Sequence, residues 1–395
     1  AESDVPGYTE GDWVCSNGDG GTYDAGSVTL ANGDVVTCAI ANDDDPATII
    51  VAKVTDPAGG TGFTFSGDAV GTIDDGGTIA VADLPAGSYT STETVPAGWV
   101  LTDITCDDAD STGDIPSQTA TFNVDNGETV TCTFTNTALA TITVAKVSDP
   151  AGGTGFGFTA DSPFGSGDFT LDDGGTQVLG SLPPNETYTI TETSLPATDP
   201  AWELTDITCV GTDGAVVDLD TDSVAVTPAP GEDVTCTFTN VQLGSILVAK
   251  ATDPAGGTGF TFTGDAAGTI DDGGTITVTD LPAGTYTSTE SLPAGWTLGD
   301  ITCDDDDSSG DLGSATATFV VDNGETVTCT FTNWALSVIV VEKVTDPTGD
   351  PTSFDFTTDA GAPFSLSDGE SQQLTSLEPG TYSVSESVPA GWTLT

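Results

Sequence analysis

The chain has 395 residues, of which 62 are acidic and only four are basic, and it contains no histidine. A formal net charge of −58 excludes binding to the phosphate backbone of nucleic acids as the main activity. The sequence has no nucleotide-binding loop and no paired-carboxylate signature, which argues against a turnover enzyme, and no apolar run is long enough to span a membrane.

In chain order, the sequence consists of three complete repeats flanked by two partial ones. Each complete repeat begins with a strand that carries one lysine and ends with the motif VTCTFTN. The first partial copy holds only the closing part of a repeat, and the last holds only its opening part. The predicted domains are a split-domain fragment at 1–46, repeats at 47–139, 140–243 and 244–336, and a second fragment at 337–395 that residues 1–46 of a neighbouring subunit would complete.

Short runs that alternate apolar and polar residues, separated by turn residues, predict an all-β fold. Helical periodicity is nowhere sustained. We expect tandem immunoglobulin-like β-sandwich domains in an elongated chain, with half-domains at both termini. The DDGG segments at 74–77, 172–175 and 271–274 are predicted to be hairpin turns.

Strand alternation places a lysine, a glutamate and an asparagine on the apolar faces of three strands in each repeat. In the first strand of the second repeat, Ile142, Val144 and Lys146 share a face, because side chains alternate along a strand. The candidate residues are Lys53, Glu93 and Asn136 in the first repeat, Lys146, Glu192 and Asn240 in the second, Lys250, Glu290 and Asn333 in the third, and Lys343, Glu386 and Asn42 in the two fragments.

Two interpretations of this buried trio remain open. A buried unpaired charge is costly, so the three side chains must meet, and the simpler interpretation is a buried ion pair with an amide partner. In the covalent interpretation, a desolvated lysine with a lowered pKa attacks the asparagine amide carbon and expels ammonia. A protonated glutamate would then polarise the carbonyl and carry protons.

Eight cysteines form four pairs, one in each complete repeat and one in the N-terminal fragment. An even count with one pair per domain predicts disulfides and therefore an extracellular protein. Metal binding is the rival interpretation, but CxxC spacing and histidine are both absent. The predicted disulfides are Cys15–Cys38, Cys106–Cys132, Cys209–Cys236 and Cys303–Cys329.

The lysine strand, the ETVPAGW, ESLPAGW and ESVPAGW segments and the closing FTN strand resemble CnaB-type domains, also called SpaA-like or prealbumin-like. These are domains of Gram-positive pilins and adhesin stalks. The resemblance implies an autocatalytic isopeptide bond between the first-strand lysine and the last-strand asparagine, assisted by the glutamate. It implies the pairs Lys53–Asn136, Lys146–Asn240 and Lys250–Asn333, with Glu93, Glu192 and Glu290 as the proton shuttles.

The two fragments are complementary, because one has Lys343 and Glu386 and the other has Asn42 and a cysteine pair. We therefore expect a structural subunit of an extracellular, pilus-like filament, in which identical subunits join head to tail by strand complementation. Lys343 of one subunit and Asn42 of the next would then be crosslinked, with Glu386 as the shuttle. The alternative is a fragment of a long, repetitive cell-surface adhesin stalk that binds a host or matrix ligand.

No cofactor is expected, although calcium remains an alternative at the acidic segments 107–114 and 304–311. These segments partly match a calcium-binding loop but lack its bidentate glutamate, so solvated loops are the simpler interpretation. The expected location is extracellular, at the cell surface, and the ligand of an adhesive role cannot be read from the sequence.

Overall fold

The computed structural model describes residues 2–17, 22–24, 27–161 and 167–395. The chain forms two compact units. One comprises residues 1–146, 157–193 and 206–238, and the other comprises 147–156, 194–205 and 239–395. The described residues are almost entirely strands and turns, with one short 3-10 helix, η1, at Leu219–Thr221. The fold class is therefore all-β, as the alternating sequence pattern predicted.

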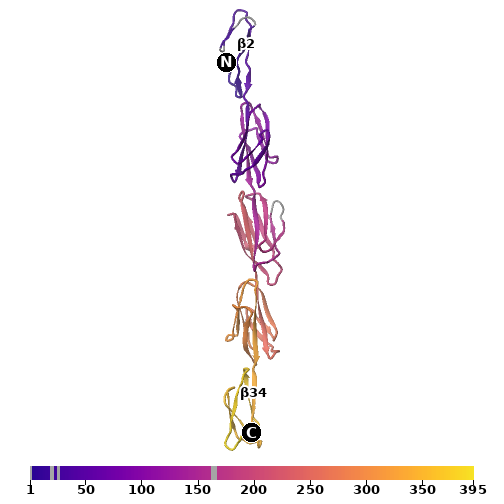
Figure 1. Cartoon of the computed structure of the whole chain (residues 1–395), viewed down its shortest axis with the longest axis vertical. Coiled ribbons are helices and arrows are strands. Elements are labelled where there is room, and N and C mark those ends of the chain that lie inside the picture. Colours follow the sequence, from indigo (N-terminus) through magenta and orange to yellow (C-terminus); the bar gives the residue numbers. More distant parts are fainter. Residues whose placement is uncertain (1, 18–21, 25–26, 162–166) are drawn as a thin grey trace. The chain divides into compact units, whose positions relative to one another are not determined.

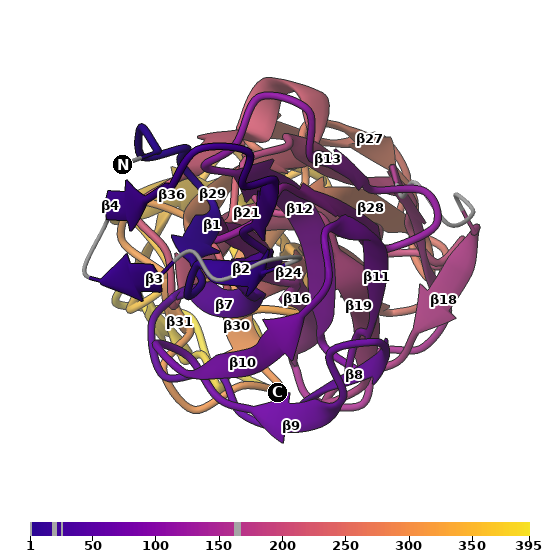
Figure 2. The ribbon, with the colours of Figure 1, turned by 90° about the horizontal axis from the view of Figure 1, so that it is seen from above.

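The first repeat is a sandwich of two sheets, coloured indigo to purple in Figure 1. One sheet has the strand order β10-β7-β15-β12 and the other has the order β13-β14-β11-β8-β9. Figure 2 views the two sheets end-on, with β7 and β10 on one side and β8 and β11 on the other. The strands are β7 Ala47–Asp56, β8 Phe63–Gly67, β9 Gly71–Ile73, β10 Thr78–Leu84, β11 Gly87–Thr94, β12 Trp99–Cys106, β13 Thr112–Asp114, β14 Thr119–Val124 and β15 Thr129–Ala138.

The first and last strands of the repeat, β7 and β15, are parallel neighbours at the centre of one sheet. Along both strands, buried residues alternate with partly exposed ones, as expected when only one face of a sheet packs against the core. Phe134 lies opposite Lys53 in this pairing. The register therefore carries Lys53 and Asn136 to the same end of the sheet.

The second and third repeats have the same arrangement. Their four-stranded sheets have the orders β19-β16-β24-β21 and β28-β25-β33-β30, and their five-stranded sheets have the orders β18-β17-β20-β23-β22 and β27-β26-β29-β32-β31. The strands of the second repeat are β16 Ala140–Asp149, β17 Phe156–Ala160, β18 Phe169–Leu171, β19 Thr176–Leu182, β20 Tyr188–Ser194, β21 Trp202–Val210, β22 Ala215–Asp218, β23 Ser223–Val226 and β24 Asp233–Gln242. Those of the third are β25 Gly244–Asp253, β26 Phe260–Gly264, β27 Gly268–Ile270, β28 Thr275–Leu281, β29 Gly284–Ser291, β30 Trp296–Cys303, β31 Ser309–Asp311, β32 Thr316–Val321 and β33 Thr326–Ala335.

The two partial copies form smaller sheets. In the N-terminal fragment β1 pairs with β6, β2 with β5 and β3 with β4, whereas the C-terminal fragment has the sheets β34-β37 and β36-β35-β38. The strands are β1 Tyr8–Glu10, β2 Val14–Asn17, β3 Thr22–Asp24, β4 Ser27–Thr29, β5 Val36–Ala39 and β6 Asn42–Asp44, and then β34 Ser337–Glu342, β35 Phe354–Thr358, β36 Phe364–Leu366, β37 Ser371–Leu377 and β38 Val384–Ser387.

The four predicted disulfides are confirmed. Each joins two neighbouring strands. Cys15–Cys38, Cys106–Cys132 and Cys303–Cys329 link directly opposed partners of an antiparallel pair. The bonds are Cys15–Cys38, Cys106–Cys132, Cys209–Cys236 and Cys303–Cys329. No helix in the described part of the chain is long and apolar enough to cross a membrane.

Candidate crosslinking site

The Lys53 side chain lies inside the sandwich with its ammonium group surrounded by oxygen atoms. Lys53 is 1% exposed. Its Nζ donates hydrogen bonds to the carbonyl oxygens of Val54 at 2.7 Å and Phe134 at 2.9 Å, and to Asn136 Oδ1 at 2.6 Å. Its Nζ also lies 4.3 Å from the centre of the Phe63 ring. The three oxygens match the three donors of an ammonium ion.

Glu93 enters the same space from the opposite sheet, where it lies beside Phe65 on β8. Its Oε1 is 3.7 Å from Lys53 Nζ, and both side chains are fully buried. Among the described residues, neither carboxylate oxygen of Glu93 accepts a hydrogen bond and Asn136 Nδ2 donates none. Buried polar atoms normally have partners, so the site carries an electrostatic cost as an ion pair.

Burial shifts the pKa values of the two ionisable groups toward each other. Desolvation lowers the pKa of Lys53 to about 8, against the opposing attraction of Glu93 and Asp75. Desolvation also raises the pKa of Glu93, opposed by the charge of Lys53 and by Asn136. Both shifts favour the neutral forms, an amine and a carboxylic acid.

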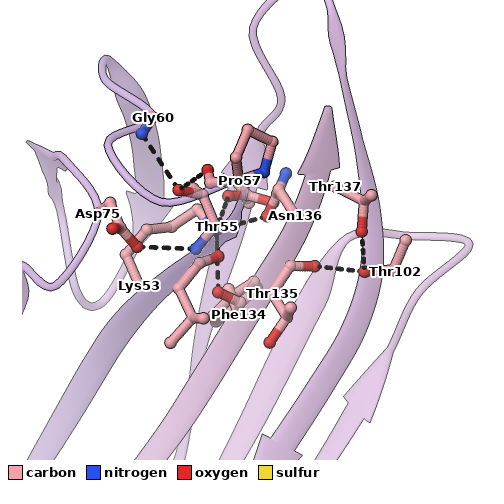
Figure 3. Close-up of polar contacts among 12 residues, drawn as sticks. Lys53, Thr55, Pro57, Gly60, Asp75, Thr102, Phe134, Thr135, Asn136 and Thr137 are labelled. Carbon is pink, nitrogen blue, oxygen red and sulfur yellow. Dashed lines mark hydrogen bonds and ion pairs between the residues drawn. The ribbon is translucent and has the colours of Figure 1, made fainter. Parts of the chain in front are cut away.

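A loop that follows the lysine strand closes this end of the sandwich, and Figure 3 shows its polar contacts. Asp75 on the DDGG turn accepts the backbone N–H of Thr55 at 2.8 Å and of Gly59 at 2.9 Å. The Thr55 hydroxyl donates to the Pro57 carbonyl and accepts the N–H of Gly60. The N–H groups of Gly59 and Thr55 hold the pKa of the Asp75 carboxyl below its usual value. Asp75 therefore fixes the loop as a carboxylate.

The loop packs directly over the aromatic residues beside the lysine. A Cβ atom on Gly60 would lie 2.8 Å from the Trp99 ring, so the backbone and the indole are in close contact at this position. Trp99 meets Phe63 edge to face at 5.5 Å between ring centres. The loop, the Trp99 ring and the Phe63 ring thus form a continuous cover between Lys53 and the solvent.

The third repeat reproduces this geometry. Lys250 Nζ donates to the carbonyl oxygens of Ala251 and Phe331 and to Asn333 Oδ1, and it lies 3.6 Å from Glu290. Here the glutamate also accepts a hydrogen bond of 3.1 Å from Asn333 Nδ2. Burial lowers the pKa of Lys250 and raises that of Glu290. Asp272 holds the loop of this repeat by the N–H groups of Thr252 and Gly256.

In the second repeat all three predicted residues are buried, Lys146 at 1%, Glu192 at 5% and Asn240 at 0% exposure. Lys146 Nζ donates to the Phe238 carbonyl oxygen at 3.2 Å, and burial lowers the lysine pKa to about 8. The longer loop after Glu192 is accommodated with that side chain in the core.

The two fragments hold the remaining predicted residues in more open surroundings. Lys343 Nζ lies 3.0 Å from Glu386 Oε1, and the two side chains are 12% and 11% exposed. They line an open cavity of about 440 Å³ together with Phe354 and Trp392. Asn42 is exposed and donates to Glu2 Oε1 at 3.2 Å. The crosslink between Lys343 and Asn42 of a neighbouring subunit therefore stays a prediction.

The sequence interpretation missed the part played by the DDGG turn. It assigned 74–77 to a hairpin, whereas the second aspartate of the turn also binds the loop after the lysine strand. A signal was present in the sequence, because an aspartate stands 22 residues after Lys53 and 22 residues after Lys250, at Asp75 and Asp272. Asp368 accepts N–H groups of Thr345 and Gly349 even in the C-terminal fragment.

The acidic segments use their carboxylates to bind their own loops. Asp108 accepts hydrogen bonds from the backbone N–H of Ala109 and from the hydroxyl of Ser111. Asp305 accepts the hydroxyl of Ser308 in the equivalent loop of the third repeat. Within the ranges that the structure describes, no group of three or more Asp, Glu, Cys or His side chains is placed to hold a metal ion.

Comparison with protein families finds the prealbumin-like fold domain of the SpaA type three times, at residues 49–138, 142–242 and 249–335. A second prealbumin-like fold domain of this type matches residues 1–40. The three main matches cover more than half of the chain. A search of curated proteins finds no match.

Several solved structures are similar to this chain. The Bacillus anthracis TIE protein is 17% identical with a TM-score of 0.33, and the match covers 76% of this chain and 55% of that one. BcpA, the major pilin subunit of Bacillus cereus, is 11% identical with a TM-score of 0.29, over 74% of this chain and all of that one. A Mobiluncus mulieris adhesin with intramolecular disulfide, isopeptide and ester bond crosslinks is 14% identical with a TM-score of 0.21, over 42% of this chain and 65% of that one.

Proposed function

Because the chain belongs to the SpaA-type family of prealbumin-like fold domains, we propose that it is a structural subunit of an extracellular, pilus-like filament whose domains are locked by lysine–asparagine isopeptide bonds. One observation carries the proposal. A buried lysine amine meets an asparagine carboxamide beside a buried glutamate in the first repeat and again in the third.

The proposed reaction begins when the proton shared by Lys53 and Glu93 rests on the glutamate. The lone pair of the neutral amine attacks Cγ of Asn136, while Glu93 donates its proton to Oδ1. One proton of the attacking nitrogen then passes through Glu93 to Nδ2, which leaves as ammonia. The proton on Oδ1 returns to Glu93 as the carbonyl re-forms. One C–N bond forms and one breaks, and Glu93 ends as it began. Val54 and Phe134 hold the amine in place, which supplies the proximity that a slow amide exchange requires.

The position of the bond favours a role under tension. It would join β7 to β15, which are the strands through which the chain enters and leaves the first repeat. Only Leu139 separates the end of β15 at Ala138 from the start of β16 at Ala140. A pulling force would therefore pass from Lys53 to Asn136 and into the next repeat without loading the residues between them.

The finer part of the proposal concerns assembly. Identical subunits join head to tail, and Lys343 of one subunit is bonded to Asn42 of the next, with Glu386 as the proton shuttle. Lys343 and Glu386 support this role because they are already adjacent and partly open to solvent. The crosslinking reaction occurs once per site, so the protein is not a turnover enzyme.

The test is the intact mass and the denaturing electrophoresis of the 395-residue chain under reducing conditions. We expect one ammonia to be lost per repeat and a ladder of subunit multiples that contains a peptide joining Lys343 to Asn42. Glu93→Gln should keep the ammonia in the first repeat only, so the third repeat serves as an internal control. A monomer of full mass would overturn the isopeptide bonds, and a monomer that has lost three ammonias would overturn the filament alone.

A further inference from the structure

The two fragments correspond to a single sandwich divided through the middle of both of its sheets. In the first repeat, β7 lies between β10 and β15, and β11 lies between β8 and β14. The C-terminal fragment supplies the counterparts of β7 to β11, and the N-terminal fragment supplies those of β12 to β15. Within the described residues, β34 and β38 each pair with a strand on one side only. The open sides are those that bind β15 and β14 in the first repeat.

The inward-facing residues of the N-terminal fragment are less buried than their counterparts in a complete repeat. Val36, Cys38 and Ile40 are only partly buried, whereas their counterparts Val130, Cys132 and Phe134 are fully buried. An unpaired strand edge beside an uncovered apolar face is a surface that pairs readily with another chain. The N-terminal fragment has the strands that match the open edges of the C-terminal fragment, so the occupant for which we argue is a second copy of this chain.

Each complete repeat contains a turn that fixes how its last strand meets its first. In the first repeat, the N–H of Asp125 binds the side chain of Glu128. The N–H of Gly127 donates to the Asp45 carbonyl at 2.8 Å, and the Glu128 carbonyl accepts the N–H of Thr48 at 2.8 Å. The same two backbone hydrogen bonds recur in the other repeats. In the second, the N–H of Gly231 donates to the Ala138 carbonyl and that of Thr141 to the Glu232 carbonyl. In the third, the N–H of Gly324 donates to the Gln242 carbonyl and that of Ser245 to the Glu325 carbonyl.

The N-terminal fragment already has this turn, at Ala31–Asp34. The N–H of Ala31 binds the Asp34 side chain at 2.6 Å, and Gly33 has the same left-handed backbone, with φ of +97°. In the described structure, however, nothing lies within 4 Å of the position of a Cβ on Gly33, whereas Gly127 faces Asp45 at this point. The turn is formed but has no linker against it.

We propose that the Ala31–Asp34 turn is the docking element that sets the register between subunits, an inference that rests on the proposed head-to-tail assembly. The Gly33 N–H would donate to the Ala335 carbonyl of a second copy, and the Asp34 carbonyl would accept the Val338 N–H of that copy. Ala335 stands eight positions before Lys343 and Val338 stands five before it, as Asp45 and Thr48 do before Lys53.

The same spacing carries the reactive residues together. Eight positions separate the acidic turn residue from the asparagine in all four copies, Glu128 to Asn136, Glu232 to Asn240, Glu325 to Asn333 and Asp34 to Asn42. Once the turn is docked, β5 therefore runs parallel to β34, and Asn42 reaches Lys343 as Asn136 reaches Lys53. A slip of one residue would turn Asn42 to the opposite face of the sheet.

The experiment compares two substitutions at Val338, whose side chain is 52% exposed on the free edge of β34. Val338→Pro removes the N–H that Asp34 would bind, and Val338→Thr keeps it and is the matched control. Both are made in the 395-residue chain, and assembly is followed by sedimentation and by denaturing electrophoresis. We expect Val338→Pro to slow assembly at least about tenfold, because one docking hydrogen bond is lost, and Val338→Thr to assemble like the native chain.

The outcomes separate this inference from the proposed function. Assembly of Val338→Pro at the native rate would overturn the docking role of the turn while leaving head-to-tail assembly intact. A native chain that stays monomeric but loses three ammonias would overturn both docking and assembly and leave the bonds within the repeats. Asn42→Ala should still associate and give no ladder, and failure of this variant to associate would show that the covalent bond, not the turn, drives assembly.

Discussion

At Lys53, a side chain that water would keep as an ammonium ion lies among apolar strands, with three oxygen atoms around its Nζ. Of these neighbours, only the Asn136 carboxamide can release a small leaving group without breaking the chain. Glu93 lies close enough to exchange a proton with the lysine and has no hydrogen-bond partner of its own among the described residues. The rate of the proposed bond formation should therefore depend on whether Lys53 or Glu93 carries the shared proton, because the Asn136 carboxamide is already in place.

The pH dependence of the bond-forming rate follows from one proton shared by two groups. In the reactive form the lysine is neutral and the glutamate is protonated. This form holds the same number of protons as the ion pair and differs only in which group carries the shared proton. The rate should therefore fall above about pH 8, the pKa of Lys53, where the pair loses this proton. It should also fall on the acid side, at a pH above the ordinary value of a glutamate, because burial raises the pKa of Glu93.

This profile can be measured by refolding unreacted chain at a series of pH values and following ammonia loss from the first repeat by mass. In Glu93→Gln no second group holds the proton, so the slow residual rate should rise with pH through the lysine pKa. A native rate that climbs steadily to about pH 10, as for an ordinary lysine, would contradict the shared-proton mechanism.

Asp75→Asn tests the loop that covers the lysine. The substitution removes the charge that accepts the N–H groups of Thr55 and Gly59. We expect slower ammonia loss in the first repeat, by about tenfold or more, because small misplacements of reacting groups are costly. Removal of a negative charge alone would lower the pKa of Lys53 and favour the free amine, so a faster reaction would show that charge, not loop position, is the role of Asp75.

The last strand, β15, shows why a disulfide accompanies the reactive site. Its outward face is a row of threonines. A shift of two residues in the pairing of β15 with its neighbours would therefore place threonines at the same positions again. On its inner face, Cys132 is bonded to Cys106 on β12, and a bulge between Leu101 and Asp103 lets β12 keep both ends in register. The disulfide therefore fixes the strand position on which Asn136 depends. The outward residues are Thr129, Thr131, Thr133, Thr135 and Thr137.

Replacing the pair with Cys106→Val and Cys132→Val should lower the free energy of unfolding of the first repeat by about 2–4 kcal/mol. It should also slow ammonia loss from that repeat, because β15 then samples other registers before the bond forms. Denaturant unfolding and peptide mass analysis measure the two effects, with the third repeat as the control. Normal bond formation in the destabilised variant would show that strand packing alone fixes the register.

The acidic loops after β12 and β30 lead to a prediction about metal removal. Asp108 and Asp305 are already occupied by hydrogen-bond donors of their own loops. We therefore expect the melting temperature of the chain to be the same with and without a calcium chelator. A fall in melting temperature on chelation, reversed by added calcium, would establish that these loops bind the ion.

The molecule as a whole carries its charge on the outside, and the four lysines are the only positive side chains. Those of the three repeats are buried, and the chain has a net charge of −58, so two copies that approach each other repel. In the proposed assembly, strand complementation therefore proceeds against repulsion between the copies, which screening by salt weakens. The neutral backbone groups of the proposed docking turn and the apolar half-core would provide the attraction.

Assembly should accelerate when the ionic strength rises from about 0.01 M to about 0.15 M, because the screening length falls from about 30 Å to about 8 Å. Light scattering on the native chain measures this rate, and bond formation within the repeats, which is intramolecular, serves as the control. Faster assembly at low salt would indicate attraction between charged groups and contradict docking through a neutral edge.

The sequence by itself determined the all-β class, the repeats and the four disulfides. Apolar and polar residues alternate along the strands of each repeat, and each complete repeat and the N-terminal fragment contain one pair of cysteines. It also singled out Lys53, Glu93 and Asn136, since a polar residue on an apolar face stands out against the strand period. Only the tertiary structure decided that β7 and β15 are parallel neighbours, which sets Lys53 against Asn136. It alone showed that Asp75 binds the covering loop, because a turn carboxylate and an N–H donor sixteen residues away meet only after the chain has folded.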